Sequence, residues 1–157
     1  MRRLFIAACV YLAAGLAGGL FHREFTKLTG FPEGGATQLA VVHTHLLTLG
    51  FLAMLLFLVL ERLFALSRSR LFGWFFWTYN AGLVLTAGML ALHGSLTVLG
   101  LESSKAIAGI AGTGHLLLGV GTTLLLVALG KRLRADRIAS ADAPLSAASD
   151  APLSAAR

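Results

Sequence analysis

Charged residues are scarce in this sequence, and cysteine and proline are scarcer still. Only 13% of the 157 residues are Asp, Glu, Lys or Arg, against roughly 25% in an ordinary soluble domain. An apolar content of 57% cannot be hidden in one water-soluble core of this size. The composition therefore excludes an ordinary soluble domain and favours the lipid bilayer as the solvent. The single cysteine, Cys9, excludes a disulfide-stabilised secreted scaffold.

Four apolar segments, at 4–21, 39–60, 74–99 and 106–129, contain no Asp, Glu, Lys, Arg or Pro. Each reaches the roughly 18–20 residues that a helix needs to cross the hydrocarbon core. The sequence therefore predicts an all-α, integral membrane four-helix bundle, with the four-transmembrane-helix domain at 1–132. The first segment also fits a signal peptide, but its length favours a retained helix.

Lys and Arg are distributed unevenly between the two ends of these segments. Three lie on the side of the 22–38 and 100–105 connections, and ten lie on the side of both termini. By the positive-inside rule we expect both termini in the cytoplasm. Membrane topology then accounts for the net charge of +6, and we expect no nucleic-acid partner. The ten residues are Arg2, Arg3, Arg62, Arg68, Arg70, Lys131, Arg132, Arg134, Arg137 and Arg157.

The last part of the chain, 133–157, is basic at first and then small and polar. The seven residues at 142–148, Asp-Ala-Pro-Leu-Ser-Ala-Ala, recur at 150–156. Repetition of low complexity is typical of disorder, so we predict a disordered tail without chemistry of its own.

The histidines gather at one depth of the predicted bundle. Because neighbouring helices alternate in direction, four of them lie about 6–14 Å from the outer end of the apolar region, and the inner half has none. An ionisable side chain at membrane depth is costly, so this layer predicts a cofactor or metal site. The alternative is that each imidazole stays neutral and hydrogen-bonds across helices. The four are His43, His45, His93 and His115, whereas His22 is expected at headgroup level.

Helical geometry separates two of these histidines. His43 and His45 are two residues apart, about 200° around a helix, so they point to opposite faces. They cannot form a compact site of the His-x3-His type. The spacing instead fits a helix that serves two centres, or one centre and an interface.

Glycines beside His115 suggest what such a site could hold. Gly112 and Gly119 share the face of His115, where missing side chains leave a shallow slot. Close helix packing is one explanation of these glycines. The other is a flat apolar macrocycle with an axial histidine, which predicts haem b as the cofactor.

The segment Val-Val-His-Thr-His-Leu at 41–46, followed by Gly50 and preceded by Arg-Glu-Phe-Thr-Lys-Leu-Thr-Gly at 23–30, resembles a family of small bacterial four-helix membrane proteins. That family is catalogued as a domain of unknown function, and the similarity covers about residues 4–132. It implies a multi-pass protein of the bacterial cytoplasmic membrane.

The same His-x-His pair more distantly resembles the haem-copper oxidase superfamily, whose catalytic subunit contains three pseudo-equivalent four-helix units. The resemblance implies a homo-oligomer, a trimer by analogy, within the lipid bilayer. It makes His43 and His45 axial-ligand candidates and His115 an opposing ligand. It leaves His93 as a metal-binding or supporting residue.

The sequence also departs from the oxidases. It has no adjacent His-His pair and no His-x3-Tyr pattern, so a complete oxygen-reducing centre is not predicted. Electron transfer, gas binding or haem handling is expected instead, and catalysis is left open. Two alternatives remain: a carrier or binding protein for copper or another transition metal, with His43, His45, His93 and His115 as ligands, and a structural bundle without a cofactor.

Overall fold

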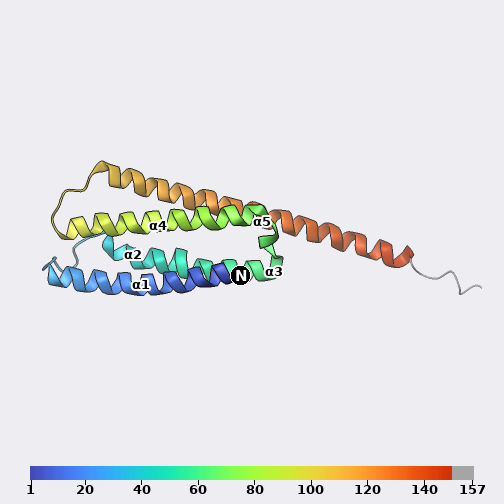
Figure 1. The fold of residues 1–157 in the computed structure, drawn as a ribbon, viewed down its shortest axis with the longest axis horizontal. Coiled ribbons are helices and arrows are strands. Elements are labelled where there is room, and N and C mark those ends of the chain that lie inside the picture. The colour runs from blue at the N-terminus through green and yellow to red at the C-terminus, as the bar shows by residue number, and fades with distance from the viewer. Residues whose placement is uncertain (150–157) are drawn as a thin grey trace, which may run out of the picture.

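The computed structural model describes residues 1–149, which consist of helices and the loops that connect them (Figure 1). Side-chain surroundings are described as far as Ser140, except at Lys105 and Ala108. The elements are α1 (Arg2–Leu28), α2 (Leu39–His45), the π-helical segment η1 (Leu46–Leu52), α3 (Ala53–Phe64), the 3₁₀ turn η2 (Leu66–Arg68), α4 (Arg70–Val98) and α5 (Lys105–Ser149).

Four helical rods are long and apolar enough to cross a membrane, which confirms the four spans expected from the sequence. The second rod is continuous, because α2, η1 and α3 follow one another without a break. Most rods extend beyond the apolar segments, since the helices continue through charged residues at their ends. The spans are Arg2–Leu28, Leu39–Phe64, Arg70–Val98 and Gly109–Ser140.

Successive rods run in opposite directions and form two side-by-side pairs, α1 with the α2–η1–α3 rod and α4 with α5 (Figure 1). The N-terminus, the turn at η2 and the C-terminal half of α5 share one end of the bundle. This end carries most of the arginines and is called the arginine-rich end below.

The α4–α5 pair is held together by a seam of small residues. Buried positions on α5 recur at intervals of four and three residues, the spacing of a coiled-coil seam. A Cβ placed on Gly82 of α4 would lie 2.8 Å from the carbonyl oxygen of Gly114, so the two backbones are in direct contact. Small residues permit such an approach, and close packing is what holds helices together in lipid. The buried α5 positions are Gly114, Leu118, Gly121, Leu125 and Ala128.

The other pair also uses glycine to bring helices together. Gly50 of η1 packs against the ring of Tyr11 on α1, and Gly15 of α1 packs against Leu47 of η1. The two pairs are joined by a hydrogen bond of 2.7 Å from the Tyr11 hydroxyl to the Asn80 side-chain oxygen on α4.

Glycines with positive φ end two of the helices. Gly30 (φ 66°) follows α1, and Gly100 (φ 69°) follows α4. In each case the next amide closes back on the helix, which satisfies a carbonyl that would otherwise lack a partner. These bonds are Phe31 N–H to the Thr26 oxygen, 3.0 Å, and Leu101 N–H to the Leu96 oxygen, 2.9 Å.

Helix α5 continues from the bundle as far as Ser149, and its side chains at 133–140 are exposed. Residues 133–141 are mostly Ala, Leu and Arg, which favour a helix without packing. Residues 150–157, with the second copy of the repeat, lie outside the described residues. The disordered tail expected at 133–157 stays a prediction.

The α4–α5 seam gives a direct test of the fold. Replacing Gly82 by leucine should force the two helices apart and destabilise the folded protein by about 1–3 kcal/mol. The measurement is the thermal unfolding midpoint in detergent, which should fall by several degrees.

Gly88→Leu is the matched control, because no heavy atom lies within 4 Å of a Cβ at Gly88 on the same helix. Equal losses in the two variants would show that the close contact between α4 and α5 is absent.

Candidate functional site

The structure brings together two of the four histidines of the predicted layer. His45 at the end of α2 and His115 on α5 have ring centroids 6.4 Å apart, with the ring planes nearly perpendicular at 87°. These two residues are called the imidazole pair below. His45 is partly exposed and His115 is exposed, so the pair lies at the surface of the single chain, where α2 approaches α5.

Both rings of the imidazole pair are held in the same way. His45 Nδ1 lies 2.9 Å from the Val41 carbonyl oxygen, and His115 Nδ1 lies 3.0 Å from the Ala111 carbonyl oxygen. In each case the imidazole reaches back one turn on its own helix. A carbonyl can only accept, so Nδ1 carries the proton and donates it, and Nε2 keeps a free lone pair. This is the tautomer in which a histidine binds a metal through Nε2.

The separation of the rings suits one metal between them. A ring whose Nε2 binds a metal at roughly 2 Å has its centroid about 3 Å from that metal. Two such rings on opposite sides of the metal would have centroids about 6 Å apart, close to the 6.4 Å observed. The centroid separation therefore matches one metal between the rings, and the Nδ1–H tautomer leaves Nε2 of each ring available as a ligand.

Open space adjoins the pair on α5. A Cβ added to Gly112 or to Gly119 would meet no heavy atom within 4 Å. A shallow cavity of about 420 Å³ lies over this face, lined by His115, Leu116, Gly119, Val120, Thr123 and Leu124. Gly112 and Gly119 therefore leave this face of α5 open, and the glycines that pack against α4 are Gly114 and Gly121, on the opposite face.

His43 lies apart from the pair. It is directed at α1, where a Cβ on Gly19 would lie 3.6 Å from the His43 side chain. The two-residue spacing thus separates His43 and His45 onto different helix neighbours. Nδ1 of His43 is buried and has no hydrogen-bond partner among the described residues.

His93 does not join the pair either. Its Nδ1 lies 3.1 Å from the Ser103 hydroxyl in the loop that leads to α5. Within the described part of the chain, no three His, Cys, Asp or Glu side chains lie close enough together to hold a metal ion. The four histidines named as candidate metal ligands therefore do not converge on one site within the described part of a single chain, because His43 and His93 face other neighbours.

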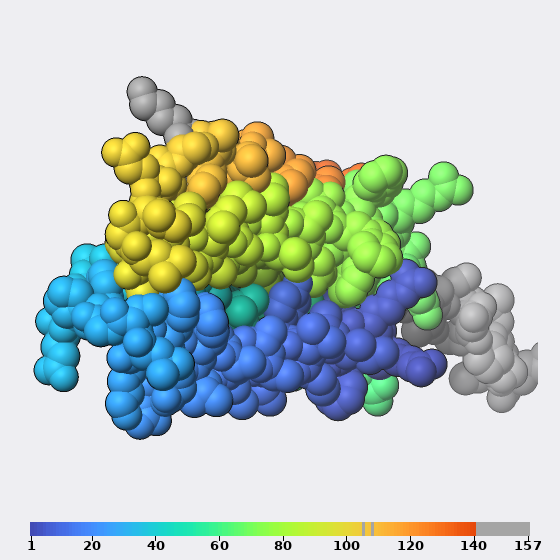
Figure 2. Space-filling view, turned by 60° about the vertical axis from the view of Figure 1, so that its left-hand side comes forward, coloured from blue at the N-terminus to red at the C-terminus, as the bar shows by residue number. Residues whose placement is uncertain are grey.

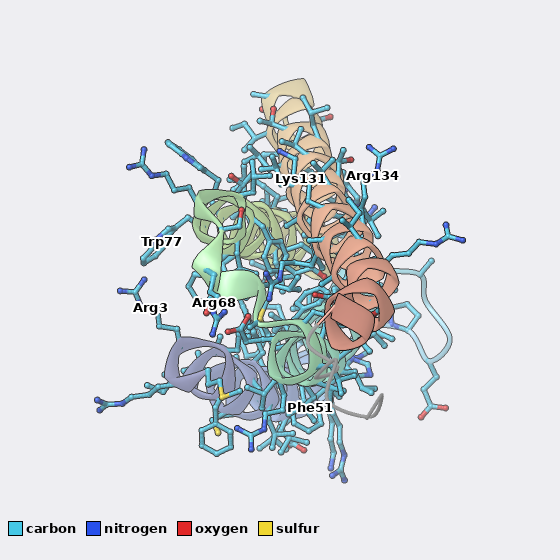
Figure 3. The ribbon with its side chains drawn as sticks, turned by 90° about the vertical axis from the view of Figure 1, so that its right-hand side faces the viewer. Arg3, Phe51, Arg68, Trp77, Lys131 and Arg134 are labelled. Atoms are coloured by element: carbon cyan, nitrogen blue, oxygen red, sulfur yellow. The ribbon has the colours of Figure 1, made fainter. Side chains whose placement is uncertain are left out.

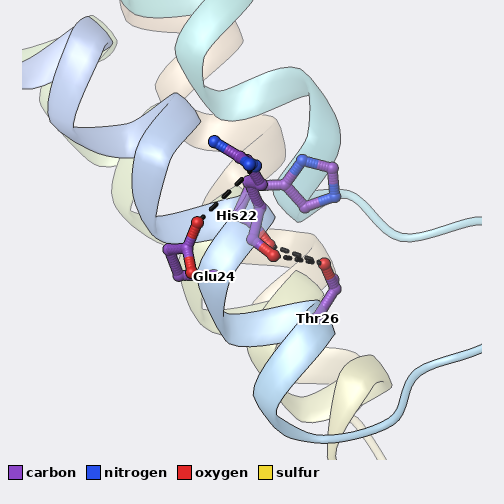
Figure 4. Close-up of polar contacts among 4 residues, drawn as sticks. His22, Glu24 and Thr26 are labelled. Carbon is purple, nitrogen blue, oxygen red and sulfur yellow. Dashed lines mark hydrogen bonds and ion pairs between the residues drawn. The ribbon is translucent and has the colours of Figure 1, made fainter.

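His22 lies near the C-terminal end of α1. The polar contacts drawn around it in Figure 4 involve its backbone carbonyl, which accepts from the Thr26 hydroxyl at 2.8 Å. Beside it, Arg23 and Glu24 form an ion pair at 3.5 Å, with both side chains well exposed. These charged neighbours fit the headgroup level expected for His22.

The sequence analysis missed the π-helical segment and the tyrosine that supports it. A π-helical turn changes the register of the backbone hydrogen bonds and is frequent at functional sites. Here it follows His45 directly, and the Tyr79 hydroxyl on α4 donates to the Leu49 carbonyl at 2.9 Å. Polar residues inside membrane spans, such as Tyr79 and Asn80, were the available signal.

Four antiparallel rods that are long and apolar enough to span a membrane, together with two imidazoles anchored to their own helices, define a four-helix bundle that is consistent with a multi-pass membrane protein and carries a candidate two-histidine site. The profile of the family described as "Protein of unknown function (DUF2871)" matches residues 1–132, and the chain belongs to that family. This confirms the expected membership in a family of unknown function. No curated protein and no solved structure matches the chain.

The support of η1 by α4 can be tested by removing one hydroxyl. Tyr79→Phe deletes the bond to the Leu49 carbonyl and leaves that carbonyl without its partner, so the free energy of unfolding should fall by about 1–2 kcal/mol. The measurement is thermal or denaturant unfolding in detergent.

Thr48→Val is the matched control, because it also removes one hydroxyl bond from η1. That bond, to the Thr44 carbonyl at 2.6 Å, lies on the exposed side. If Thr48→Val is the more destabilising change, η1 does not depend on α4.

Proposed function

We propose that this protein is a haem b-binding membrane protein in which His45 and His115 are the two axial ligands. The observation that carries the proposal is the imidazole pair, with a centroid separation of 6.4 Å and both Nδ1 atoms anchored to backbone carbonyls. The open face over Gly112 and Gly119 supports it further, because a flat apolar ring needs a slot beside its axial histidine.

Two axial imidazoles support electron transfer over the other redox roles. A bound haem would supply one-electron chemistry here. The chain's own contribution is to fix both rings by their Nδ1–H bonds to backbone carbonyls. The aliphatic residues Leu116, Val120 and Leu124 line the open face beside His115. Because neither side would be left open for a small molecule, this ligand set favours electron transfer over gas binding and over oxygen reduction.

A homo-oligomer is part of the same proposal. The face of α5 that bears His115 is not covered within the chain, and Leu116 is 68% exposed on it. A neighbouring copy in the membrane could cover this face. The resemblance to haem-copper oxidases favours three copies, each equivalent to one four-helix unit of those enzymes.

The second candidate is a copper-binding protein or carrier that uses the same imidazole pair. Imidazole suits copper as well as iron, and one ion between the rings would satisfy the same distance. The pair alone offers two ligands, so this candidate needs further ligands from a second copy or from solvent.

The spectrum of the haem-loaded protein tests the leading proposal. We expect purified protein to take up haem and to give the spectrum of a six-coordinate, low-spin iron. Either His45→Ala or His115→Ala removes one axial ligand, so each should change the spin state and weaken haem binding by about tenfold or more.

His93→Ala and His22→Ala are the controls, because both residues lie outside the pair and should leave the spectrum unchanged. Elemental analysis separates the two candidates: iron with a porphyrin absorption band supports haem, and copper without that band supports the second. A haem spectrum that is unaffected by His45→Ala and by His115→Ala would refute the imidazole pair as the ligands, and a protein that takes up neither haem nor copper would be a structural bundle.

We also propose that both termini lie in the cytoplasm, at the inner face of the bacterial membrane. The support is the concentration of arginines at the end of the bundle that holds the N-terminus and η2.

The orientation can be measured by labelling single cysteines in a Cys9→Ser background. We expect a membrane-impermeant maleimide to label Glu33→Cys in intact cells, because Glu33 is exposed in the α1–α2 loop. Ser140→Cys, exposed on α5, should react only after the cells are opened. The reverse pattern would mean that the bundle is inserted the other way round.

A further inference from the structure

Two distant segments of the chain form a cationic pocket at the arginine-rich end. The pocket has a volume of about 550 Å³ and is built from the start of α1 and from η2 with the start of α4. No Asp or Glu is among the residues that line it. Its polar lining is Arg2, Arg3, Ser67, Arg68, Ser69 and Arg70, which are together called the arginine pocket.

Among the described residues, no carboxylate forms an ion pair with the arginines of this pocket. The ion pair in the described part of the chain is Arg23–Glu24, at the opposite end of the bundle. The nearest buried carboxylate, Glu61, accepts instead from Ser67, whose backbone N–H lies 2.7 Å from it and whose hydroxyl also donates to it. These bonds fix the turn at η2 and leave the guanidinium groups free for an anion.

The start of α4 adds to the positive potential of the pocket. Ser69 caps this 29-residue helix by accepting from the Leu71 N–H. The N-terminus of a long helix carries a partial positive charge and favours phosphate groups nearby. The partial charge at the start of α4 and the charges of the arginines therefore both raise the electrostatic potential inside the pocket.

An apolar groove continues from the arginine pocket along the outside of the bundle. A second cavity, of about 380 Å³, shares Arg3 and Phe76 with the pocket and runs between α1 and α4. Ile6, Val10 and Trp77 line it, and α1 and α4 lie side by side along this face in Figure 2. Figure 3 shows Arg3, Arg68 and Trp77 on the same flank of the bundle. A free phosphate ion would not use such a groove.

We propose that the arginine pocket binds the phosphate headgroup of an anionic glycerophospholipid, with one acyl chain in the groove between α1 and α4. Guanidinium groups pair with phosphate oxygens bidentately, and basic pockets at the membrane surface are suited to anionic headgroups. The positive-inside rule explains an excess of arginine at this end but requires no common pocket, and it does not place an apolar groove beside one.

Quenching of Trp77 by brominated lipids tests the proposal in reconstituted vesicles. The chain has two tryptophans, so Trp74→Phe leaves Trp77 as the single reporter in the groove. In phosphatidylcholine vesicles, brominated phosphatidylglycerol should quench Trp77 at about tenfold lower mole fraction than brominated phosphatidylcholine does. Absence of this preference would overturn the proposal.

Paired variants separate the pocket from general charge. Arg3→Gln with Arg68→Gln should abolish the preference, whereas Arg62→Gln with Arg137→Gln, which removes the same charge outside the pocket, should preserve it. If both double variants lost the preference for brominated phosphatidylglycerol equally, the preference would depend only on the net charge of the protein. Circular dichroism checks that each pair is folded.

The groove is tested separately by Ala7→Leu, which narrows it without changing any charge. Quenching by brominated phosphatidylglycerol should fall in this variant even if the arginine variants do not fold. If Ala7→Leu leaves the quenching unchanged while millimolar inorganic phosphate abolishes the preference for brominated phosphatidylglycerol, the pocket takes a phosphate group alone and the lipid assignment is wrong.

Discussion

The direct contact between the backbones of α4 and α5 is the constraint on which the candidate site depends. Once Gly82 faces Gly114, the rotation of α5 about its own axis is fixed, because Leu118 and Gly121 must follow on the same side. His115 is the residue after Gly114 and is therefore turned about 100° away from the seam. The packing that stabilises the bundle thus also decides which way the candidate ligand points.

The position of the second candidate ligand, His45, depends on the other helix pair. His45 precedes η1, whose position is set by Gly50 against Tyr11 and by the Tyr79 hydroxyl on the Leu49 carbonyl. Tyr11 in turn donates to Asn80 on α4. The bonds donated by Tyr11 and Tyr79 lie between the two helix pairs. The imidazole pair therefore forms where the two helix pairs meet, and each helix pair supplies one of its rings.

The sequence was sufficient for the features that follow from helix length and spacing. Four charge-free segments predicted the four spans, and the two-residue spacing of His43 and His45 predicted their different neighbours. The sequence could not distinguish the glycines that pack against another helix from those with open space beside them. Every face of a membrane helix is apolar, so hydrophobic periodicity does not show which face is buried. Gly112 and Gly114 differ only in what lies opposite them.

Other features depended on interactions between elements and were therefore missing from the sequence analysis. The pairing of His93 with Ser103 arises from the path of the loop after Gly100. The π-helical segment has no sequence signature as clear as proline or a cap. The shared arginine pocket required knowing that the start of α1 lies beside η2.

The π-helical segment between His45 and α3 also decides where this rod can change in length. A π-helical turn corresponds to one residue inserted into a regular α-helix. Deleting a single residue between 46 and 52 would restore a regular helix, and because the π-helical turn absorbs the extra residue, the parts before and after it would keep nearly the same relative rotation. A deletion in the regular helix at 53–64 has no such turn to absorb it and would turn His45 by about 100° relative to the end of α3. Length variation in α3 is thus coupled to the site, whereas the loop at 29–38 can lengthen without turning either imidazole.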